Sequence, residues 1–297
     1  MRRLAHAAAA TGLAALAGCG PGPAPPDEQT LTAPPPPLRA EQSLDVPETD
    51  AVGAITTIAT RVCRPTGKGP FPLAILNHAA AQPGEDRAEI GVAGCDSPLP
   101  RWFLDHDYVV ALPLRRGYGR SDAGWAADPG SCASPDYVKS GFEAARDIAA
   151  VADYLEKSPD VRPHGLVVAG EDEGGWAALA FASVPANTDL AAVIDVDGGM
   201  GGHAASETGH VCRPDLLVDA AGTFGKTTRV PTLWIYASND PVFPPELARA
   251  MLAAFTGAGG KAEFAAPASP EGDGHVWMFS GPGTAVWSPL LDGFLKG

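Results

Sequence analysis

From about residue 50 onward, short runs of apolar residues alternate with longer segments whose apolar positions recur at helical spacing. Because the apolar runs are short and nearly continuous, they predict strands that are buried on both faces. Strands separated by helices predict a mainly parallel sheet with helices on both faces. The predicted strands span residues 54–62, 73–77, 108–112, 166–169, 191–196, 232–237 and 262–266, and the predicted helices span 101–107, 138–155, 174 onward, 245–255 and 289–295.

The first part of the chain has a different composition and is expected to lie outside this sheet. Arg2 and Arg3 precede an apolar run over residues 4–17, which is too short to cross a membrane and suits the core of a signal peptide. The run ends in Leu-Ala-Gly-Cys at 16–19, which resembles a bacterial lipobox. The resemblance implies cleavage before Cys19 and attachment of lipid to that residue; an ordinary signal peptide with a chance cysteine is the alternative.

The region that follows is rich in proline, with four consecutive prolines at 34–37, and favours an extended spacer. We therefore assign residues 1–18 to a lipoprotein signal peptide, 19–48 to a lipidated linker and 49–297 to the globular domain. The expected location is the periplasmic or extracellular face of a bacterial membrane, to which the Cys19 lipid would tether the chain.

Charge and cysteine content narrow the class of protein further. The chain has 35 acidic and 21 basic side chains, and this excess of negative charge argues against a nucleic-acid partner. Four cysteines remain beyond Cys19, an even number that suggests two disulfides in an exported chain. Three pairings are possible, and we favour Cys63 with Cys95 and Cys132 with Cys212. Four free buried thiols are the alternative.

The most informative segment is Gly-Glu-Asp-Glu-Gly-Gly at 170–175. It follows an apolar run at 165–169 and precedes an alanine-rich run at 176–180, so a strand, a tight turn and a helix are expected. This layout resembles the nucleophile elbow of α/β-hydrolases, which normally reads G-x-S-x-G. Asp172 stands where that pattern has serine.

Two further residues follow the elbow in the chain order of an α/β-hydrolase triad. Asp240 comes after the predicted strand 232–237, and His275 comes after the last predicted strand. A carboxylate beside an imidazole fixes its tautomer and stabilises its charged form, so Asp240 is expected to orient His275. The backbone N–H of Glu173, with one from Ala79 or Ala80, would form an oxyanion hole.

The segments 77–79, 113–121, 233–245 and 272–275 together resemble a branch of dienelactone-hydrolase-like α/β-hydrolases, over roughly residues 60–297. The resemblance implies an α/β-hydrolase fold with little or no cap domain. It also implies a Ser–His–Asp hydrolase of esters or related substrates, in which Asp240 and His275 match the acid and the base. The sequence departs from the family at Asp172 and at Ala79, where glycine is usual. Asp195 and Asp197 add carboxylates at a strand end that is commonly apolar or small in such proteins.

Asp172 limits the chemistry. A carboxylate that attacked a carbonyl would leave a mixed anhydride, whereas attack on saturated carbon leaves an ordinary alkyl ester. The Asp elbows of haloalkane dehalogenases and epoxide hydrolases resemble this arrangement, but they have tryptophan after the Asp. Here Glu173 follows, and its negative charge is expected to repel a departing anion. The leading hypothesis is therefore a hydrolase with an altered nucleophile, acting on a small ester-like or alkyl substrate.

Other roles for Asp172 remain open. One alternative is that Asp172 acts as a general base. Another is that it binds a divalent cation together with neighbouring side chains, although no spacing motif supports a metal site. Those neighbours are Glu173, Asp197, Asp240 and His275. A non-catalytic binding protein on the same fold is the alternative from another functional class. No cofactor is expected, and the expected partner is a small-molecule substrate or ligand. His78 and Arg115, with Arg116, are interpreted as structural residues that anchor neighbouring loops.

Overall fold

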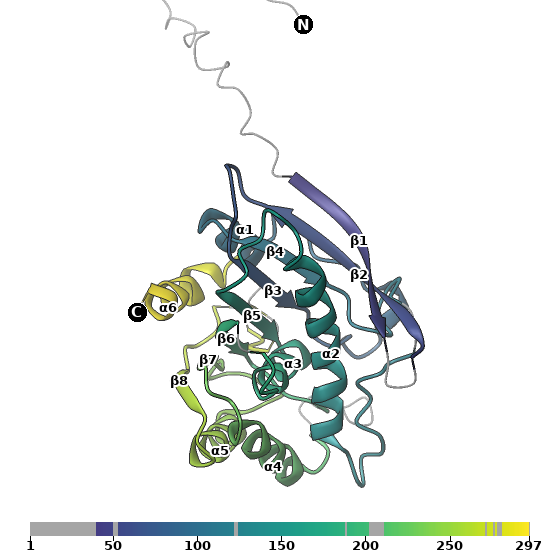
Figure 1. Cartoon of the computed structure of the whole chain (residues 1–297). Coiled ribbons are helices and arrows are strands. Elements are labelled where there is room, and N and C mark those ends of the chain that lie inside the picture. The colour runs from purple at the N-terminus through teal and green to yellow at the C-terminus, as the bar shows by residue number, and fades with distance from the viewer. Residues whose placement is uncertain are drawn as a thin grey trace, which may run out of the picture. The chain divides into compact units, whose positions relative to one another are not determined.

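One mixed sheet organises the molecule. The computed structural model describes residues 40–49, 53–121, 124–187, 189–201, 211–270, 272–275, 277 and 281–296. Within these residues, eight strands pair in the order β1-β2-β4-β3-β5-β6-β7-β8 (Figure 1). β1 is antiparallel to β2 and β2 to β4, and the other neighbours are parallel. The strands are β1 Ala40–Thr49, β2 Ile55–Arg64, β3 Leu73–Asn77, β4 Val109–Pro113, β5 Leu166–Glu171, β6 Leu190–Val196, β7 Pro231–Ile235 and β8 Lys261–Ala265.

Helices pack on both faces of this sheet. One apolar core joins the sheet to α2 (Tyr137–Leu155), α3 (Glu173–Ala182), α4 (Pro214–Gly225) and α5 (Pro245–Gly257). A second core joins the opposite face to α1 (Pro98–Asp105) and α6 (Thr284–Lys296). Successive strand residues alternate between the two cores, as Ala74, Ile75 and Leu76 do in β3. The prediction of a mainly parallel sheet covered on both faces is confirmed.

The predicted elements agree with the observed ones to within a few residues, with two exceptions. Helix α4 was not predicted, although proline begins it and apolar residues recur along it. The second exception is β1, because residues 40–48 were assigned to the linker. The described residues from Ala40 onward instead belong to the same compact unit as the rest of the sheet.

The linker boundary at residue 48 is therefore wrong, and the reason is the pairing of β1. This strand matches β2 residue by residue, from Ala40 opposite Arg64 to Thr49 opposite Ile55. Val46 is fully buried against the sheet. Pro47 is compatible with the strand because β1 lies at the edge of the sheet, where a missing N–H need not interrupt a ladder on both sides.

Two disulfides link described segments that are distant in sequence. Cys63 at the end of β2 is bonded to Cys95, and Cys132 is bonded to Cys212 just before α4. The favoured pairing is thus confirmed. In the part of the chain that the structure describes, no helix has both the length and the apolar character needed to span a membrane.

Candidate active site

A sharp turn between β5 and α3 carries Asp172. Its backbone has φ 54° and ψ −123°, a conformation that persists in a non-glycine residue only where its surroundings enforce it. Small neighbours allow the turn. A Cβ atom at Gly170 would lie 2.2 Å from the carbonyl carbon of Gly174, and one at Gly174 would lie 2.5 Å from the carbonyl oxygen of Asn77. The predicted elbow is present, with Asp172 at the carboxyl edge of the sheet.

Asp172, His275 and Asp240 converge, with His275 in the middle. Nδ1 of His275 lies 3.2 Å from Oδ2 of Asp240, and Nε2 of His275 lies 3.6 Å from Oδ2 of Asp172. The other oxygen of Asp240 accepts hydrogen bonds from the backbone N–H groups of Val242 at 2.6 Å and Phe243 at 3.1 Å. All three triad side chains are buried. The backbone contacts therefore hold the Asp240 carboxylate in the orientation that faces His275.

The two carboxylates decide the protonation state of His275. Burial lowers the pKa of the imidazole, but the charges and hydrogen bonds of Asp172 and Asp240 outweigh burial and raise this pKa to about 11. His275 is therefore an imidazolium at neutral pH. The two carboxylates favour the charged ring, in which both nitrogens carry a proton. In this resting state His275 therefore cannot accept a proton from water.

Of the three expected oxyanion donors, the N–H of Ala80 contacts Asp172. The backbone N–H of Ala80 donates a hydrogen bond to Oδ2 of Asp172 over 2.9 Å. Ala79 presents its carbonyl oxygen to Nδ1 of His78 at 2.7 Å. Glu173 is the first residue of α3, so its N–H is one of the donors that a helix leaves unpaired in its first turn. A group positioned to stabilise an oxyanion thus binds the carboxylate at the nucleophile position.

His78 and Arg115 support the loop that holds Ala80. The backbone N–H of Arg115 donates to Nε2 of His78 over 3.1 Å, so Nδ1 carries the ring proton and donates to Ala79. Burial and then the charge of Arg115 lower the pKa of His78 well below its usual value. The Arg115 guanidinium also donates to the carbonyl oxygens of His78 and Ala79. These contacts fit the structural role expected of both residues.

Glu173 has an unusual environment for a residue next to the nucleophile position. The hydroxyl of Tyr118 donates to Oε2 of Glu173 over 2.9 Å, and Nη2 of Arg115 lies 3.5 Å from the same oxygen. Burial raises the pKa of Glu173 to about 7; Arg115 opposes the rise, Asp172 adds to it, and the Tyr118 hydrogen bond opposes it. The side chain is therefore not the permanent negative charge that the sequence suggested.

A pocket of about 360 Å³ opens onto the elbow. Asp172 and Glu173 line it, and so do Tyr118, Trp125 and the disulfide-bonded Cys132 and Cys212; the remaining lining residues are Ala80, Ala81, Arg87, Asp128, Pro129, Gly130 and Gly201. The guanidinium carbon of Arg87 lies 3.8 Å from the centroid of the Trp125 ring. The pocket thus combines two carboxylates of the elbow with aromatic walls, and a small molecule bound there would contact Asp172.

Solved structures resemble the chain over most of its length, whereas no protein-family model and no curated protein sequence matches it. A protein assigned as a dienelactone hydrolase from Klebsiella pneumoniae superposes with a TM-score of 0.58 at 17% identity, covering 88% of this chain and 100% of that one. An esterase from Pyrococcus furiosus gives 0.60 at 13% identity, with coverages of 86% and 92%. An acetyl xylan esterase from Paenibacillus sp. R4 gives 0.59 at 17% identity, with coverages of 89% and 86%.

The chain has the α/β-hydrolase fold. At these identities the likeness concerns the fold, and function depends on the residues that the fold carries. The α/β-hydrolase fold accounts for the placement of the elbow after β5, of Asp240 after β7 and of His275 after β8.

Within this α/β-hydrolase fold, two carboxylates hold the loop that carries His275, and the sequence did not reveal this role. Oε1 of Glu171 accepts a hydrogen bond from the backbone N–H of Trp277 over 2.7 Å. Oδ2 of Asp197 accepts one from the indole N–H of Trp277 over 2.6 Å, and its Oδ1 accepts one from the N–H of Ala237. The His275 loop is thereby tied to the elbow and to the ends of β6 and β7.

Asp195 lies deeper and has a structural contact. The hydroxyl of Tyr236 lies 2.9 Å from Oδ2 of Asp195 and 2.5 Å from the carbonyl oxygen of Gly198. Burial raises the pKa of Asp195, and the Tyr236 hydrogen bond opposes part of this rise. The resulting pKa is about 7. A protonated Asp195 would donate to Tyr236 while Tyr236 donates to Gly198, because a hydroxyl has a single proton to give.

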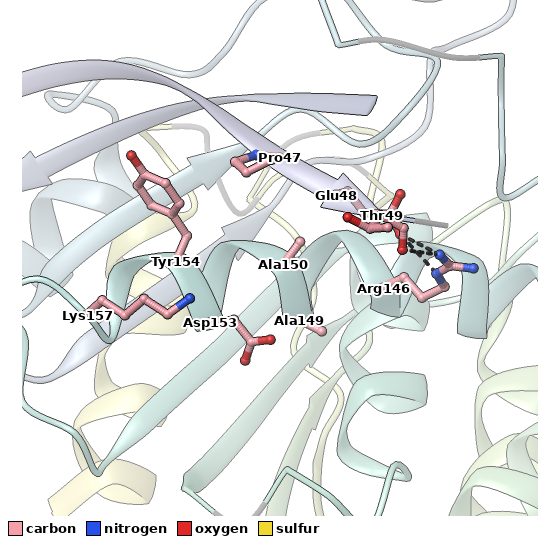
Figure 2. Close-up of a pocket in the computed structure, with 9 residues that line it drawn as sticks. All are labelled: Pro47, Glu48, Thr49, Arg146, Ala149, Ala150, Asp153, Tyr154 and Lys157. Carbon is pink, nitrogen blue, oxygen red and sulfur yellow. Dashed lines mark hydrogen bonds and ion pairs between the residues drawn. The ribbon is translucent and has the colours of Figure 1, made fainter. Parts of the chain in front are cut away.

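A second pocket of about 390 Å³ lies away from the triad, between β1 and α2 (Figure 2). Figure 2 shows Arg146 of α2 reaching across to Glu48 and Thr49 of β1, where it donates hydrogen bonds to both. The elbow residues do not line this groove. Among the described residues, no group of three or more His, Cys, Asp and Glu side chains is arranged to hold a metal ion.

Proposed function

We propose that the protein is a hydrolase in which Asp172 attacks a saturated carbon of a small substrate. The carboxylate of Asp172 forms a C–O bond with that carbon, and the bond from the carbon to the leaving group breaks with its electron pair. The product of this step is an alkyl ester on Asp172. Water then hydrolyses the ester, which releases the alcohol and restores the carboxylate.

The hydrogen bond from Ala80 to Asp172 carries this proposal. When water attacks Cγ of the ester, negative charge develops on the carbonyl oxygen of Asp172 itself. Oδ2 of Asp172 already accepts the Ala80 N–H, so the oxyanion donor is in place for the hydrolysis of an enzyme-bound ester. A substrate carbonyl would have to displace Oδ2 to use the same donor. The geometry therefore favours alkyl transfer over acyl transfer.

The first step also supplies the base for the second. An alkyl ester of Asp172 has no charge, so one of the two carboxylates that raise the pKa of His275 disappears when the ester forms. The pKa of His275 then falls, and the imidazolium gives up a proton. Neutral His275, oriented by Asp240, takes a proton from the attacking water and later returns it to the departing alkoxide.

Oxygen-18 labelling tests the role of Asp172. The full chain is incubated with an alkyl iodide or a terminal epoxide in H₂¹⁸O for less than one turnover, and the peptide that contains Asp172 is mass-analysed. If Asp172 is the nucleophile, its original oxygen leaves in the product and ¹⁸O enters the side chain. If ¹⁸O appears only in the product, Asp172 is a base and the proposal is wrong. No turnover and no adduct with either probe would indicate a non-catalytic binding protein.

A further inference from the structure

We propose that Glu173 is the acid that protonates the leaving group, and that the substrate class is therefore a cyclic ether such as an epoxide rather than an alkyl halide. This inference rests on the proposed function, since it requires Asp172 to attack carbon. It adds a second catalytic residue and a substrate class to that reaction.

The placement of Glu173 carries the inference. Glu173 follows Asp172 directly, and both residues line the same pocket. The side chain of Glu173 retains 8% of its exposure to solvent. The side chain of Arg115, its cationic neighbour, is more deeply buried, at 1%. Tyr118, which also lines the pocket, and Arg115 both contact the same oxygen of Glu173, Oε2, at 2.9 Å and 3.5 Å. A molecule attacked by Asp172 would thus have a carboxyl group beside it.

The chemistry of the leaving group separates the two substrate classes. A halide departs as a stable anion and needs no proton, and a carboxylate beside it would repel it. An oxygen that leaves a carbon becomes a strongly basic alkoxide, so a proton donor next to it lowers the barrier. A pKa near 7 keeps a large share of Glu173 in the acid form at neutral pH. Glu173 therefore suits an oxygen leaving group.

The proton balance closes over the whole cycle. In ring opening, Asp172 bonds to one epoxide carbon, the C–O bond breaks, and the ring oxygen takes the proton of Glu173. The proton that His275 releases on ester formation restores Glu173, and His275 then takes a proton from water. Collapse of the tetrahedral adduct gives the alkoxide the proton of His275, and the Asp172 carboxyl group returns its own proton to His275. The net reaction is epoxide plus water to diol.

Two probes with the same carbon chain test the inference: 1,2-epoxybutane and 1-iodobutane. The chain carries His275→Gln so that the ester accumulates, and the rate of Asp172 alkylation is measured by intact mass and peptide mapping. Glu173→Gln, introduced in this background, keeps the size of the side chain but cannot donate a carboxyl proton. The ratio of epoxide to iodide alkylation should fall about 100-fold, within the range of general acid catalysis.

Glu263→Gln is the matched control, because it makes the same change at an exposed residue of β8 that does not line the pocket. The ratio should therefore stay at the value of the His275→Gln background. An equal fall for both probes in Glu173→Gln would give Glu173 a structural role only. If the His275→Gln protein with Glu173 intact were alkylated by the iodide but not by the epoxide, the inference would be overturned and the proposed function would stand. No alkylation by either probe would overturn both.

Discussion

The backbone N–H of Ala80 and the carboxylate of Asp172 form a 2.9 Å hydrogen bond in the resting protein. In a hydrolase with a serine elbow, such a donor would await the oxygen of a substrate carbonyl. Here the side chain at the elbow is long enough to reach the donor itself. The same oxygen, Oδ2 of Asp172, lies 3.6 Å from Nε2 of His275. One substitution relative to the usual elbow thus changes both the oxyanion donor and the base.

Asp172→Ser should convert the site to ester hydrolysis. The shorter side chain would release the Ala80 N–H, and the loss of one carboxylate would lower the pKa of His275 so that it can act as a base. Hydrolysis of p-nitrophenyl acetate should rise at least about 100-fold over the unsubstituted protein, the scale of general base catalysis. The double variant Asp172→Ser/His275→Ala serves as the control and should lack this gain. A folded but inert Asp172→Ser protein would show that the remaining machinery is not competent.

His275 should remain protonated far into the alkaline range. With a pKa of about 11, its ring resonances in NMR should stay those of an imidazolium through pH 9, whereas Asp172→Asn should shift the titration to lower pH. The folded-state pKa lies above the usual 6.5, so this group stabilises the fold fully below about pH 6.5, and the stabilisation is lost as the pH rises toward 11. The free energy of unfolding should therefore fall across that window, and less steeply in Asp172→Asn.

His78 provides an internal reference for that titration. Its pKa is lowered well below 6.5 by burial and by Arg115, so its ring should be neutral over the same pH range. A His275 ring that titrates near pH 6.5 in the unsubstituted protein would contradict the charged triad.

Trp277→Phe should destabilise the fold more than the same change at Trp287. Both indoles are fully buried, but the Trp277 N–H donates to Asp197, whereas no described residue accepts from the Trp287 N–H. Trp287→Phe therefore reports the loss of ring volume without the loss of a hydrogen bond. The free energy of unfolding, measured in urea, should be lower in Trp277→Phe than in Trp287→Phe by about 1–3 kcal/mol. This difference is the cost of leaving a buried carboxylate without its hydrogen bond. Equal losses would show that the Asp197 contact contributes nothing.

Cys19→Ala tests the predicted membrane anchor, whose residues lie outside the described part of the chain. If Cys19 carries lipid, the expressed protein should move from the membrane fraction to the soluble fraction when this residue is replaced. The comparison is with Cys63→Ala/Cys95→Ala, which removes a described disulfide and leaves the lipobox intact. An unchanged distribution of Cys19→Ala between the fractions would refute lipid attachment.

The elbow could be read from the sequence because its geometry is local. Gly170 and Gly174 flank Asp172 at fixed spacing, and the apolar strand before it and the alanine-rich helix after it are evident in the residues. Asp240 and His275 were also found, because the α/β order of strands places them in loops at the same edge. Their convergence within hydrogen-bonding range followed from topology rather than from a long motif.

Contacts across the sheet were not predictable in the same way. Trp277 donates hydrogen bonds to Glu171 and Asp197, which lie 106 and 80 residues away in the sequence. No local pattern links these residues. Strand β1 was missed because Pro47 and the charged residues around it have the composition of a linker, and only pairing with β2 makes the segment a strand. The altered charge of Glu173 likewise arises from burial, which the sequence alone does not give.

The disulfide between Cys132 and Cys212 has a consequence for selectivity among nucleophiles. Both residues line the pocket that contains Asp172. As free thiols they would react with the same electrophilic carbons that Asp172 is proposed to attack, and a thiolate is the stronger nucleophile. Oxidation removes this competitor from the pocket wall. In a reducing compartment the proposed substrate would alkylate these thiols irreversibly, so the proposed reaction requires that the disulfide has formed first.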